Sequence, residues 1–196
     1  MRSLKTKTAK KKSPTPKNGR KAHREPPESP SPPGLDRSAA RSSAAEMSWA
    51  HFDRLVQQLA KAAKKLDPDA IVGVAHGGVF VGGALASAMQ REFYPVRISR
   101  RSRDVGLRGN PKLSGVMPKE LKGKRVLIVD DIASSGDTLQ LASAHAKGVG
   151  AKAVATGALV CRPKGYQPDI HALKEDTFFV FPWDYAAVAE EQRFEL

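Results

Sequence analysis

A short apolar segment that ends in two carboxylates constrains this sequence more than any other feature. Residues 126–129, Val-Leu-Ile-Val, are mostly β-branched, which is typical of a strand buried on both faces. Asp130 and Asp131 follow directly, then small and hydroxyl-bearing residues, and an apolar spacing of helical period begins at Leu139. This order predicts a strand, a loop at its carboxyl end and a helix N-terminus, which is where open α/β sheets bind ligands.

The loop after the carboxylates contains groups that suit a phosphate. Gly136 allows close approach of the backbone, Ser135 and Thr138 carry hydroxyl donors, and the first N–H groups of a helix point outward. The paired carboxylates suit vicinal hydroxyls or a hydrated magnesium ion. A phosphate and a diol held this close together are the parts of a ribose 5-phosphate. The alternative is an ordinary helix cap, but a cap requires one such residue and the loop supplies several.

The segment VDDIASSGDT resembles the ribose-phosphate loop of type I phosphoribosyltransferases. The resemblance implies that Asp130 and Asp131 contact the ribose hydroxyls, in part through Mg²⁺, and that the following turn wraps the 5-phosphate. The residues that it assigns to this turn are Ile132, Ala133, Ser134, Ser135, Gly136, Asp137 and Thr138. It also implies a Rossmann-like parallel α/β sheet with a small hood, and the alternation of strand and helix patterns along the chain agrees with that fold class.

A second unit of strand, glycine turn and helix precedes this segment. Residues 70–74 are apolar, and a small, apolar helical segment is expected at residues 79–89. In the resembled family the loop between them binds pyrophosphate, which assigns His76, Gly77 and Gly78 to that role. The family often has a basic residue where His76 stands. The alternative is a glycine turn that only packs tightly.

An arginine-rich polar segment, residues 100–115, follows a third expected strand at residues 94–99. Loops of this length in a compact domain are usually functional or disordered, and guanidinium groups neutralise diphosphates. Its placement resembles the mobile hood of the family, with Arg100 and Arg101 nearest the strand. A solvated basic hairpin is the alternative.

The C-terminal part, with strands expected at residues 154–161 and 178–181, resembles the purine branch of the family, near the xanthine, guanine and hypoxanthine enzymes. The resemblance assigns Arg162, or else Lys164, to the oxo group at purine C6, Trp183 to stacking on the base, and Asp184 to a second magnesium ion. A guanidinium donates to an oxo group but repels an exocyclic amine, which argues against adenine. The alternative for Trp183 is a core aromatic.

Ser134 departs from the oxopurine pattern. The family usually has Asp at this position, three residues after the second carboxylate, where it is thought to handle the proton on purine N7. A serine hydroxyl is a poor base near neutral pH. With Ser134 as a catalytic candidate beside Asp130 and Asp131, either the proton goes to water, the substrate is unusual, or activity is low.

The basic charge of the chain is concentrated at its N-terminus. The 196 residues carry a net charge of +13, and residues 1–45 hold 12 Lys and Arg against 3 Asp and Glu. Seven of the fourteen prolines also lie in this segment, so we expect a disordered tail at residues 1–45 and a phosphoribosyltransferase domain at residues 46–196. Contact between the KTKTAKKK run and nucleic acid is the alternative to a solvated tail.

The lone cysteine, Cys161, excludes an internal disulfide and fits a cytoplasmic location. The sequence also has no secretory signal and no apolar run near the ~20 residues that a membrane span needs, which agrees with that location.

The resemblance implies a magnesium-dependent transferase for purine salvage. Its substrates are phosphoribosyl pyrophosphate and a 6-oxopurine (hypoxanthine, guanine or xanthine), and it releases pyrophosphate. The resemblance also implies a homodimer or larger homo-oligomer. The alternatives are a non-catalytic regulator that binds a sugar phosphate or nucleotide on the same fold, and a transferase for a pyrimidine or another nucleophile.

Overall fold

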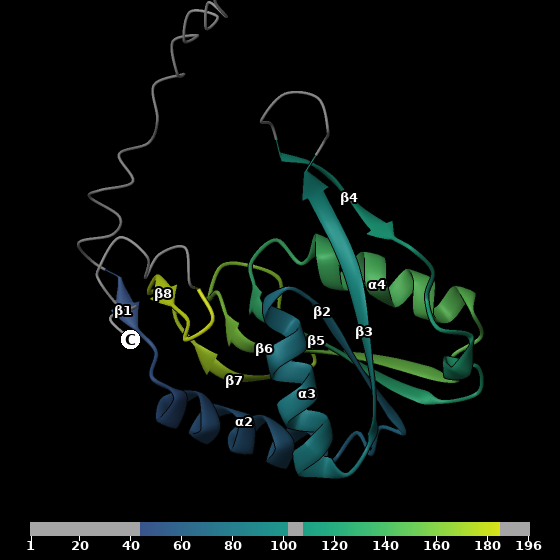
Figure 1. The fold of residues 1–196 in the computed structure, drawn as a ribbon, viewed down its shortest axis with the longest axis horizontal. Helices are drawn as coiled ribbons and strands as arrows, with labels where there is room; N and C mark the ends of the chain where they lie inside the picture. Colours follow the sequence, from purple (N-terminus) through teal and green to yellow (C-terminus); the bar gives the residue numbers. More distant parts are fainter. Residues whose placement is uncertain (1–43, 102–107, 185–196) are drawn as a thin grey trace, which may run out of the picture. The chain divides into compact units, whose positions relative to one another are not determined.

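The computed structural model describes residues 44–101 and 108–184. The helices are α2 (Trp49–Ala63), α3 (Gly77–Met89), α4 (Asp137–Gly148) and the 3-10 helix η1 (Lys119–Leu121). The strands are β1 (Ala45–Glu46), β2 (Ala70–Ala75), β3 (Glu92–Arg101), β4 (Arg108–Ser114), β5 (Arg125–Ala133), β6 (Ala153–Cys161), β7 (Ile170–Lys174) and β8 (Phe179–Val180). Across the described residues, a six-stranded sheet has the order β4-β3-β2-β5-β6-β7, and β1 pairs with β8 in a second, two-stranded sheet (Figure 1).

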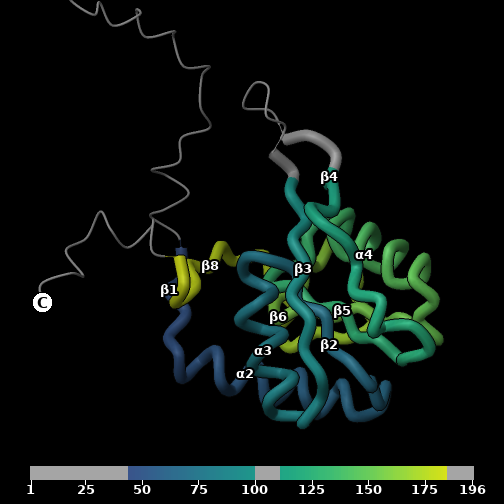
Figure 2. Tube along the Cα trace, turned by 45° about the vertical axis from the view of Figure 1, so that its right-hand side comes forward, coloured from purple at the N-terminus to yellow at the C-terminus, as the bar shows by residue number. Residues whose placement is uncertain are grey.

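The central sheet is parallel from β3 to β7, which confirms the predicted α/β fold. The exception is β4, which lies antiparallel beside β3 with Arg97 opposite Ser114 (Figure 2). This part of the polar segment was expected to be a loop. Gly109, Asn110 and Pro111 are poor strand formers, so the local sequence does not indicate the strand, and pairing with β3 determines it.

The alternating side chains of the central strands divide the core into two layers. Ile71, Leu127 and Val129 pack in the layer that contains the buried faces of α2 and α3. Val72 and Ile128 pack in the other layer, with α4. This division follows from the two-residue period of a strand, and Figure 1 shows α3 and α4 on different sides of the sheet.

Helix α2 begins where the sequence predicts. The Ser48 side chain is the N-cap and accepts a hydrogen bond from the His51 N–H at 3.2 Å. Phe52, Val56 and Leu59 face the core at the expected helical spacing.

The first and last strands differ from the expectation. The segment expected as a strand at residues 178–181 contains the two-residue β8, which pairs with β1 so that Ala45 lies opposite Phe179. Ala45 is therefore part of the folded chain, although the tail was expected to include it. Residues 1–43 of that tail lie outside the described residues. The strand β7, which was not predicted, completes the central sheet. Within the part of the chain that the structure describes, no helix is long and apolar enough to span a bilayer.

The connection from β6 to β7, residues 162–169, contains no helix. The two strands are parallel, with Gly157 opposite Ile170 and Cys161 opposite Lys174. Parallel neighbours usually need a crossover of about a dozen residues or more. This shorter connection starts beside the end of β5, where the Arg162 N–H donates to the Ala133 carbonyl at 3.0 Å.

Candidate functional site

The paired carboxylates are the centre of the candidate site. The strand β5 continues through Ala133, so Asp130 and Asp131 are strand residues and not loop residues, which corrects the predicted end at residue 129. The Asp131 N–H donates to Asp130 Oδ1 at 3.0 Å, and the Ile132 N–H donates to Asp131 Oδ1 at 2.8 Å. These backbone donors fix the orientation of both carboxylates at the carboxyl end of the strand.

The first turn of α3 lies directly against these carboxylates. A Cβ atom on Gly77 would lie 1.7 Å from Asp131 Oδ2, and one on Gly78 would lie 3.0 Å from Asp130 Oδ1. Neither position has room for a side chain. The fold therefore brings together the two segments that the sequence motifs assign to pyrophosphate and to ribose.

His76 occupies the position before α3. Its side chain is exposed, the peptide bond that joins it to Ala75 is cis, and its carbonyl accepts a hydrogen bond from the Val79 N–H at 3.1 Å. The first N–H groups of a helix have no carbonyl partner within the helix and favour anions. The α3 N-terminus is thus oriented for a negative group beside the carboxylates.

The turn after β5 leads into α4, which begins at Asp137, just before the apolar spacing that starts at Leu139. Gly136 caps this helix with φ +81°, a conformation that favours glycine. The Ser135 hydroxyl donates to Asp137 Oδ2 at 2.8 Å. The side chains of Ser134, Ser135 and Asp137 are exposed, and the N-terminal end of α4 favours an anion there.

Two residues assigned to this turn face the core. Ala133 is buried in the layer with α4, and Ile132 packs against the layer with α2 and α3. Only the backbone groups of Ala133 are therefore available to a substrate, while the side chain of Ile132 is half-buried. The motif could not show this, because it does not tell which way each side chain points.

Asp184 adds a third carboxylate near the pair. The pKa of Asp131 is raised above its ordinary value, mainly because the carboxyl group is buried. The negative charge of Asp184 raises this pKa further. The Asp184 carboxylate accepts a hydrogen bond from the Phe181 N–H at 2.9 Å, which holds it in place.

These carboxylates have the oxygen ligands that Mg²⁺ prefers. Among the residues described, however, no three His, Cys, Asp or Glu side chains converge on a common metal position. The donor set thus fits an ion held by one or two carboxylates, with substrate oxygens and water as the other ligands, and does not form an all-protein cage.

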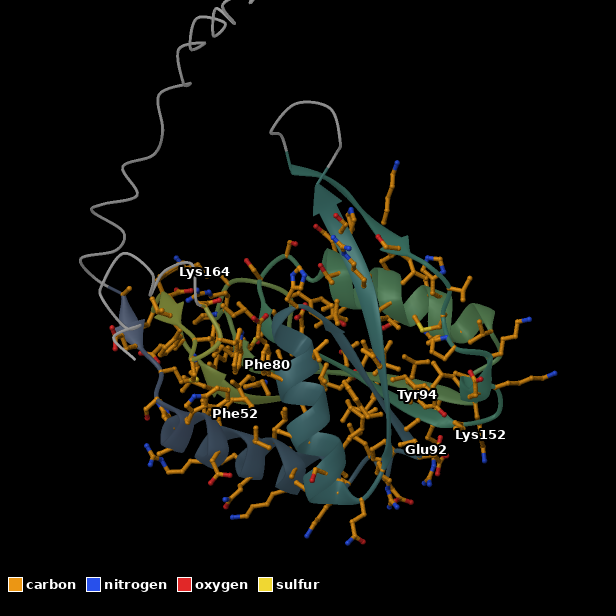
Figure 3. The ribbon with its side chains drawn as sticks, in the orientation of Figure 1. Phe52, Phe80, Glu92, Tyr94, Lys152 and Lys164 are labelled. Carbon is orange, nitrogen blue, oxygen red and sulfur yellow. The ribbon has the colours of Figure 1, made fainter. Side chains whose placement is uncertain are left out.

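Arg162 is anchored at the start of the β6–β7 connection. Its Nη1 donates to the Thr177 carbonyl at 2.5 Å and to the Glu175 carbonyl at 3.2 Å. These contacts hold the guanidinium between the end of β6 and the chain before β8. Lys164 is exposed on the same connection (Figure 3).

Trp183 lies in an aromatic cluster. Its indole stacks with Phe80 at 4.7 Å and with Phe181 at 4.9 Å between ring centroids, and only 8% of the residue is exposed. Phe52 packs against it in a T-shaped arrangement, with 5.2 Å between ring centroids. Its Nε1 has no hydrogen-bond partner among the residues that the structure describes. This packing matches the core-aromatic alternative, because stacking on a base would require one of the phenylalanines to move.

The hood is described only in part. Arg100 and Arg101 are the last residues of β3, and residues 102–107 of the arginine-rich segment lie outside the described residues. Contact between these arginines and pyrophosphate stays a prediction.

The sequence motifs missed Tyr166. A Cβ atom on Gly136 would lie 2.2 Å from Tyr166 Cγ, and the Tyr166 N–H donates to the Ser134 carbonyl at 2.7 Å. The only signal in the sequence is a tyrosine between Gly165 and Pro168 in an otherwise polar connection.

Comparison with known proteins identifies the family. A model of the phosphoribosyl transferase domain matches residues 44–190. The chain belongs to the phosphoribosyltransferase family.

Among curated relatives, the orotate phosphoribosyltransferase of Saccharolobus solfataricus is 28% identical over 117 residues, which are 60% of this chain and 56% of that protein. The adenine phosphoribosyltransferase of Chlorobaculum parvum is 31% identical over 106 residues, 50% of this chain and 59% of that protein. The chain thus spans little more than half the length of these relatives.

Solved phosphoribosyltransferase structures agree with the fold. A purine phosphoribosyltransferase from Pyrococcus horikoshii superposes with a TM-score of 0.65 and 28% identity, covering 72% of this chain and 95% of that one. The xanthine-guanine-hypoxanthine phosphoribosyltransferase of Helicobacter pylori gives 0.61 at 19% identity, covering 75% and 97%, and this likeness concerns the fold alone. The predicted family and fold are confirmed. The purine branch is not distinguished, because the curated relatives carry the names of adenine and orotate enzymes.

Proposed function

We propose that this chain transfers a phosphoribosyl group from phosphoribosyl pyrophosphate to a base and releases pyrophosphate. The observation that supports this most directly is the contact between the Gly77–Gly78 turn and the carboxylates of Asp130 and Asp131, beside the Gly136 turn at the start of α4. A ligand at this edge of the sheet has two carboxylates next to the N-termini of α3 and α4, which suits a diol between two phosphate groups.

Each part of the site has a separate task in this reaction. Asp130 and Asp131 accept hydrogen bonds from the ribose hydroxyls, and their charge favours the positive charge that develops on the sugar ring. The turn at Gly136 receives the 5-phosphate, and the first N–H groups of α3 face the diphosphate. Mg²⁺, when bound by carboxylates of this set, neutralises the diphosphate leaving group.

For the base, we propose a 6-oxopurine. The anchored guanidinium of Arg162 supports this choice, because a guanidinium only donates hydrogen bonds and therefore suits an oxo group at purine C6. Lys164, exposed on the same connection, is the other candidate donor. Stacking by Trp183 would require rearrangement of the aromatic cluster.

Ser134 favours a second candidate function. A serine hydroxyl is a poor base for the proton on a purine nitrogen near neutral pH. A regulator that binds the sugar phosphate or a nucleotide without turnover needs no such base, and neither does a transferase for a pyrimidine or another nucleophile.

A base panel tests the proposed function. Magnesium-dependent release of pyrophosphate is measured with hypoxanthine, guanine, xanthine, adenine and orotate, and binding of phosphoribosyl pyrophosphate is measured separately by calorimetry. We expect turnover on a 6-oxopurine to exceed that on adenine and orotate by at least about ten-fold, which corresponds to ~1.4 kcal/mol. Binding without turnover on any base would instead favour the regulator, and turnover on orotate alone would favour the pyrimidine enzyme.

The role of the paired carboxylates is tested in the same assay with a variant of matched size. Replacing both Asp130 and Asp131 by Asn preserves their size but removes both charges, so we expect the affinity for phosphoribosyl pyrophosphate to fall by about 100-fold, near 2.7 kcal/mol. Asp53→Asn, on the exposed face of α2, is the control. Undiminished affinity in the double variant would contradict the proposed function.

We also propose a homodimer or larger homo-oligomer, a cytoplasmic location, and a folded domain separate from the basic tail. Light scattering on the full chain and on a chain that begins at residue 44 tests the first and last of these. A monomer in both would contradict the proposed assembly.

A further inference from the structure

The β6–β7 connection is joined through backbone groups to the turn after β5, residues 134–136, which the proposed function assigns to the 5-phosphate and which we call the phosphate turn. The Tyr166 N–H donates to the Ser134 carbonyl at 2.7 Å, and the Arg162 N–H donates to the Ala133 carbonyl at 3.0 Å. A Cβ atom on Gly165 would lie 2.3 Å from the same Ser134 carbonyl oxygen. The two segments are therefore in direct contact, and neither can shift without moving the other.

The ring of Tyr166 fills the space beside Gly136. A Cβ atom there would lie 2.2 Å from Tyr166 Cγ, 2.4 Å from its Cβ and 2.6 Å from its Cδ2. Gly136 has φ +81°, a conformation that a glycine can leave easily because it lacks a side chain. The ring supplies the lateral packing that Gly136 itself does not have.

The hydroxyl of Tyr166 is held by a chain of hydrogen bonds. Thr156, on β6, is only 5% exposed, and its hydroxyl donates to Asp169 Oδ2 at 2.9 Å. Since that bond uses the only hydroxyl proton of Thr156, the Tyr166 hydroxyl is the donor in its 3.2 Å contact with Thr156 Oγ1. The Thr156 N–H also donates to Asp169 Oδ2, at 2.7 Å. The ring is thus fixed at both of its ends.

We propose that Tyr166 is a positioning residue that holds the Ser134–Gly136 turn in the conformation that receives the 5-phosphate. This inference rests on the proposed function of the turn. Without the ring, the turn has other conformations available. Part of the binding free energy of the phosphate is then used to order the turn, so the affinity falls. The ring keeps the turn ordered before the ligand arrives.

Three variants test the role of Tyr166. Tyr166→Ala removes the ring, and Tyr166→Phe removes only the hydroxyl. Tyr94→Ala is the matched control, because Tyr94 is also half-buried and donates to Glu92 Oε2 at 2.7 Å. Figure 3 shows Tyr94 and Glu92 together, on the opposite side of the domain from Lys164.

The measurements are the dissociation constant of ribose 5-phosphate by calorimetry, KM for each substrate, kcat and Tm. For Tyr166→Ala we expect the dissociation constant and the KM for phosphoribosyl pyrophosphate to rise by about ten-fold, with smaller changes in kcat and in the KM for the base. For Tyr166→Phe we expect both values to return to within about two-fold of the wild type, because the ring remains. Tyr94→Ala should lower Tm without raising either value.

The outcomes separate this inference from the proposed function. Wild-type affinity for ribose 5-phosphate in Tyr166→Ala would overturn the role of Tyr166 and leave the proposed function intact. A loss of affinity in Tyr166→Ala that is no larger than the loss in Tyr94→Ala would also overturn it. Binding by the wild type without turnover would remove the proposed catalysis, and the calorimetric series would still decide the role of Tyr166. If the wild type does not bind ribose 5-phosphate, the KM for phosphoribosyl pyrophosphate decides the role of Tyr166, and a wild type that neither binds nor turns over phosphoribosyl pyrophosphate would overturn both.

Discussion

Glycine residues determine the shape of the candidate site at the residue scale. Gly77 and Gly78 allow α3 to lie against Asp131 and Asp130, and Gly136 leaves room for the ring of Tyr166. In each case the missing side chain creates a contact between segments that are distant in the sequence. A single methyl group at one of these positions is therefore a sharp test of the site.

For Gly77→Ala we expect kcat/KM for phosphoribosyl pyrophosphate to fall by about 100-fold, because displacing a catalytic group by ~1 Å costs roughly that much. The added Cβ would lie 1.7 Å from Asp131 Oδ2, so the carboxylate must move. Steady-state kinetics at saturating base measures the loss.

Gly83→Ala is the control on the same helix. Its Cβ would meet only Phe93 Cε1, at 4.0 Å, so the substitution fits. Replacing a helical glycine by alanine stabilises by about 0.5–1 kcal/mol, and kinetics should remain those of the wild type. Equal losses in both variants would show that α3 as a whole is sensitive and that Gly77 has no special role.

The sequence was informative about some residues of the site and silent about others. Asp130, Asp131 and Gly136 could be found from their order after an apolar strand, since that order is local. The contact of Gly77 with Asp131 and the packing of Tyr166 on Gly136 depend on how α3 and the β6–β7 connection lie in space. Local sequence does not contain that information.

At the scale of elements, periodicity was enough for α2, α3, β2, β5 and β6, since each has a clear apolar pattern. The strands β4 and β7 were missed for physical reasons. The first contains glycine, asparagine and proline, and the second, Ile-His-Ala-Leu-Lys, has no continuous apolar run, so both depend on pairing with a neighbour.

The aromatic cluster gives a prediction at this scale, because it joins α3 to the segment after β8. Phe80→Ala removes a ring stacked on Trp183, and stacked aromatic pairs contribute ~0.5–1.5 kcal/mol beyond their buried area. We expect this variant to lose about 1 kcal/mol more free energy of unfolding than Phe178→Ala, measured by urea denaturation.

Phe178 is the appropriate comparison because the two residues are similarly exposed, at 40% for Phe80 and 52% for Phe178. Equal losses would mean that the stack on Trp183 adds nothing to stability. In that case Trp183 would be easier to displace, and its assignment to the base would gain support.

At the scale of the whole molecule, the two ends of the sheet have different roles. The carboxyl ends of β2 and β5 hold the candidate site. At their amino ends, Arg125 pairs with Asp69 at 2.6 Å and with Asp67 at 2.5 Å, and Arg91 pairs with Asp67 at 3.1 Å. This ion network ties the starts of the two central strands together, at the opposite end of these strands from the candidate site.

The network predicts how stability depends on pH. Hydrogen bonds from Arg125 hold the pKa of Asp69 well below its usual range. A depressed carboxyl pKa stabilises the fold above the usual value of about 4, and this contribution is lost as the pH falls through the depressed value. We therefore expect Asp69→Asn to lower Tm most near neutral pH, with the difference from the wild type shrinking at acidic pH.

Thermal unfolding of wild type and variant, followed from neutral pH into the acidic range, measures this difference. Asp53→Asn is the control, because Asp53 accepts a hydrogen bond from Gln57 and has no arginine partner in the described network. A difference between wild type and Asp69→Asn that stays constant with pH would contradict the assignment.

The family could be predicted for the molecule as a whole because three segments occur in the expected order: two strand-turn-helix units and a C-terminal Pro-Trp-Asp sequence. The base that the protein uses could not be predicted, because the choice of base depends on where the anchored Arg162 and the packed Trp183 lie relative to a bound sugar. Those positions are set by carbonyl groups and phenylalanine rings from elsewhere in the chain.

The helix-free connection after β6 has a consequence for how this protein can change its substrate. One short stretch carries Arg162 at its start and Tyr166 four positions later, so the contact that we propose for the base and the one that we propose for the phosphate turn share the same few peptide units. An insertion that widened the base pocket would also loosen the ribose end. We therefore expect natural and engineered shifts in specificity to come from side-chain replacement in this stretch, while its length stays constant.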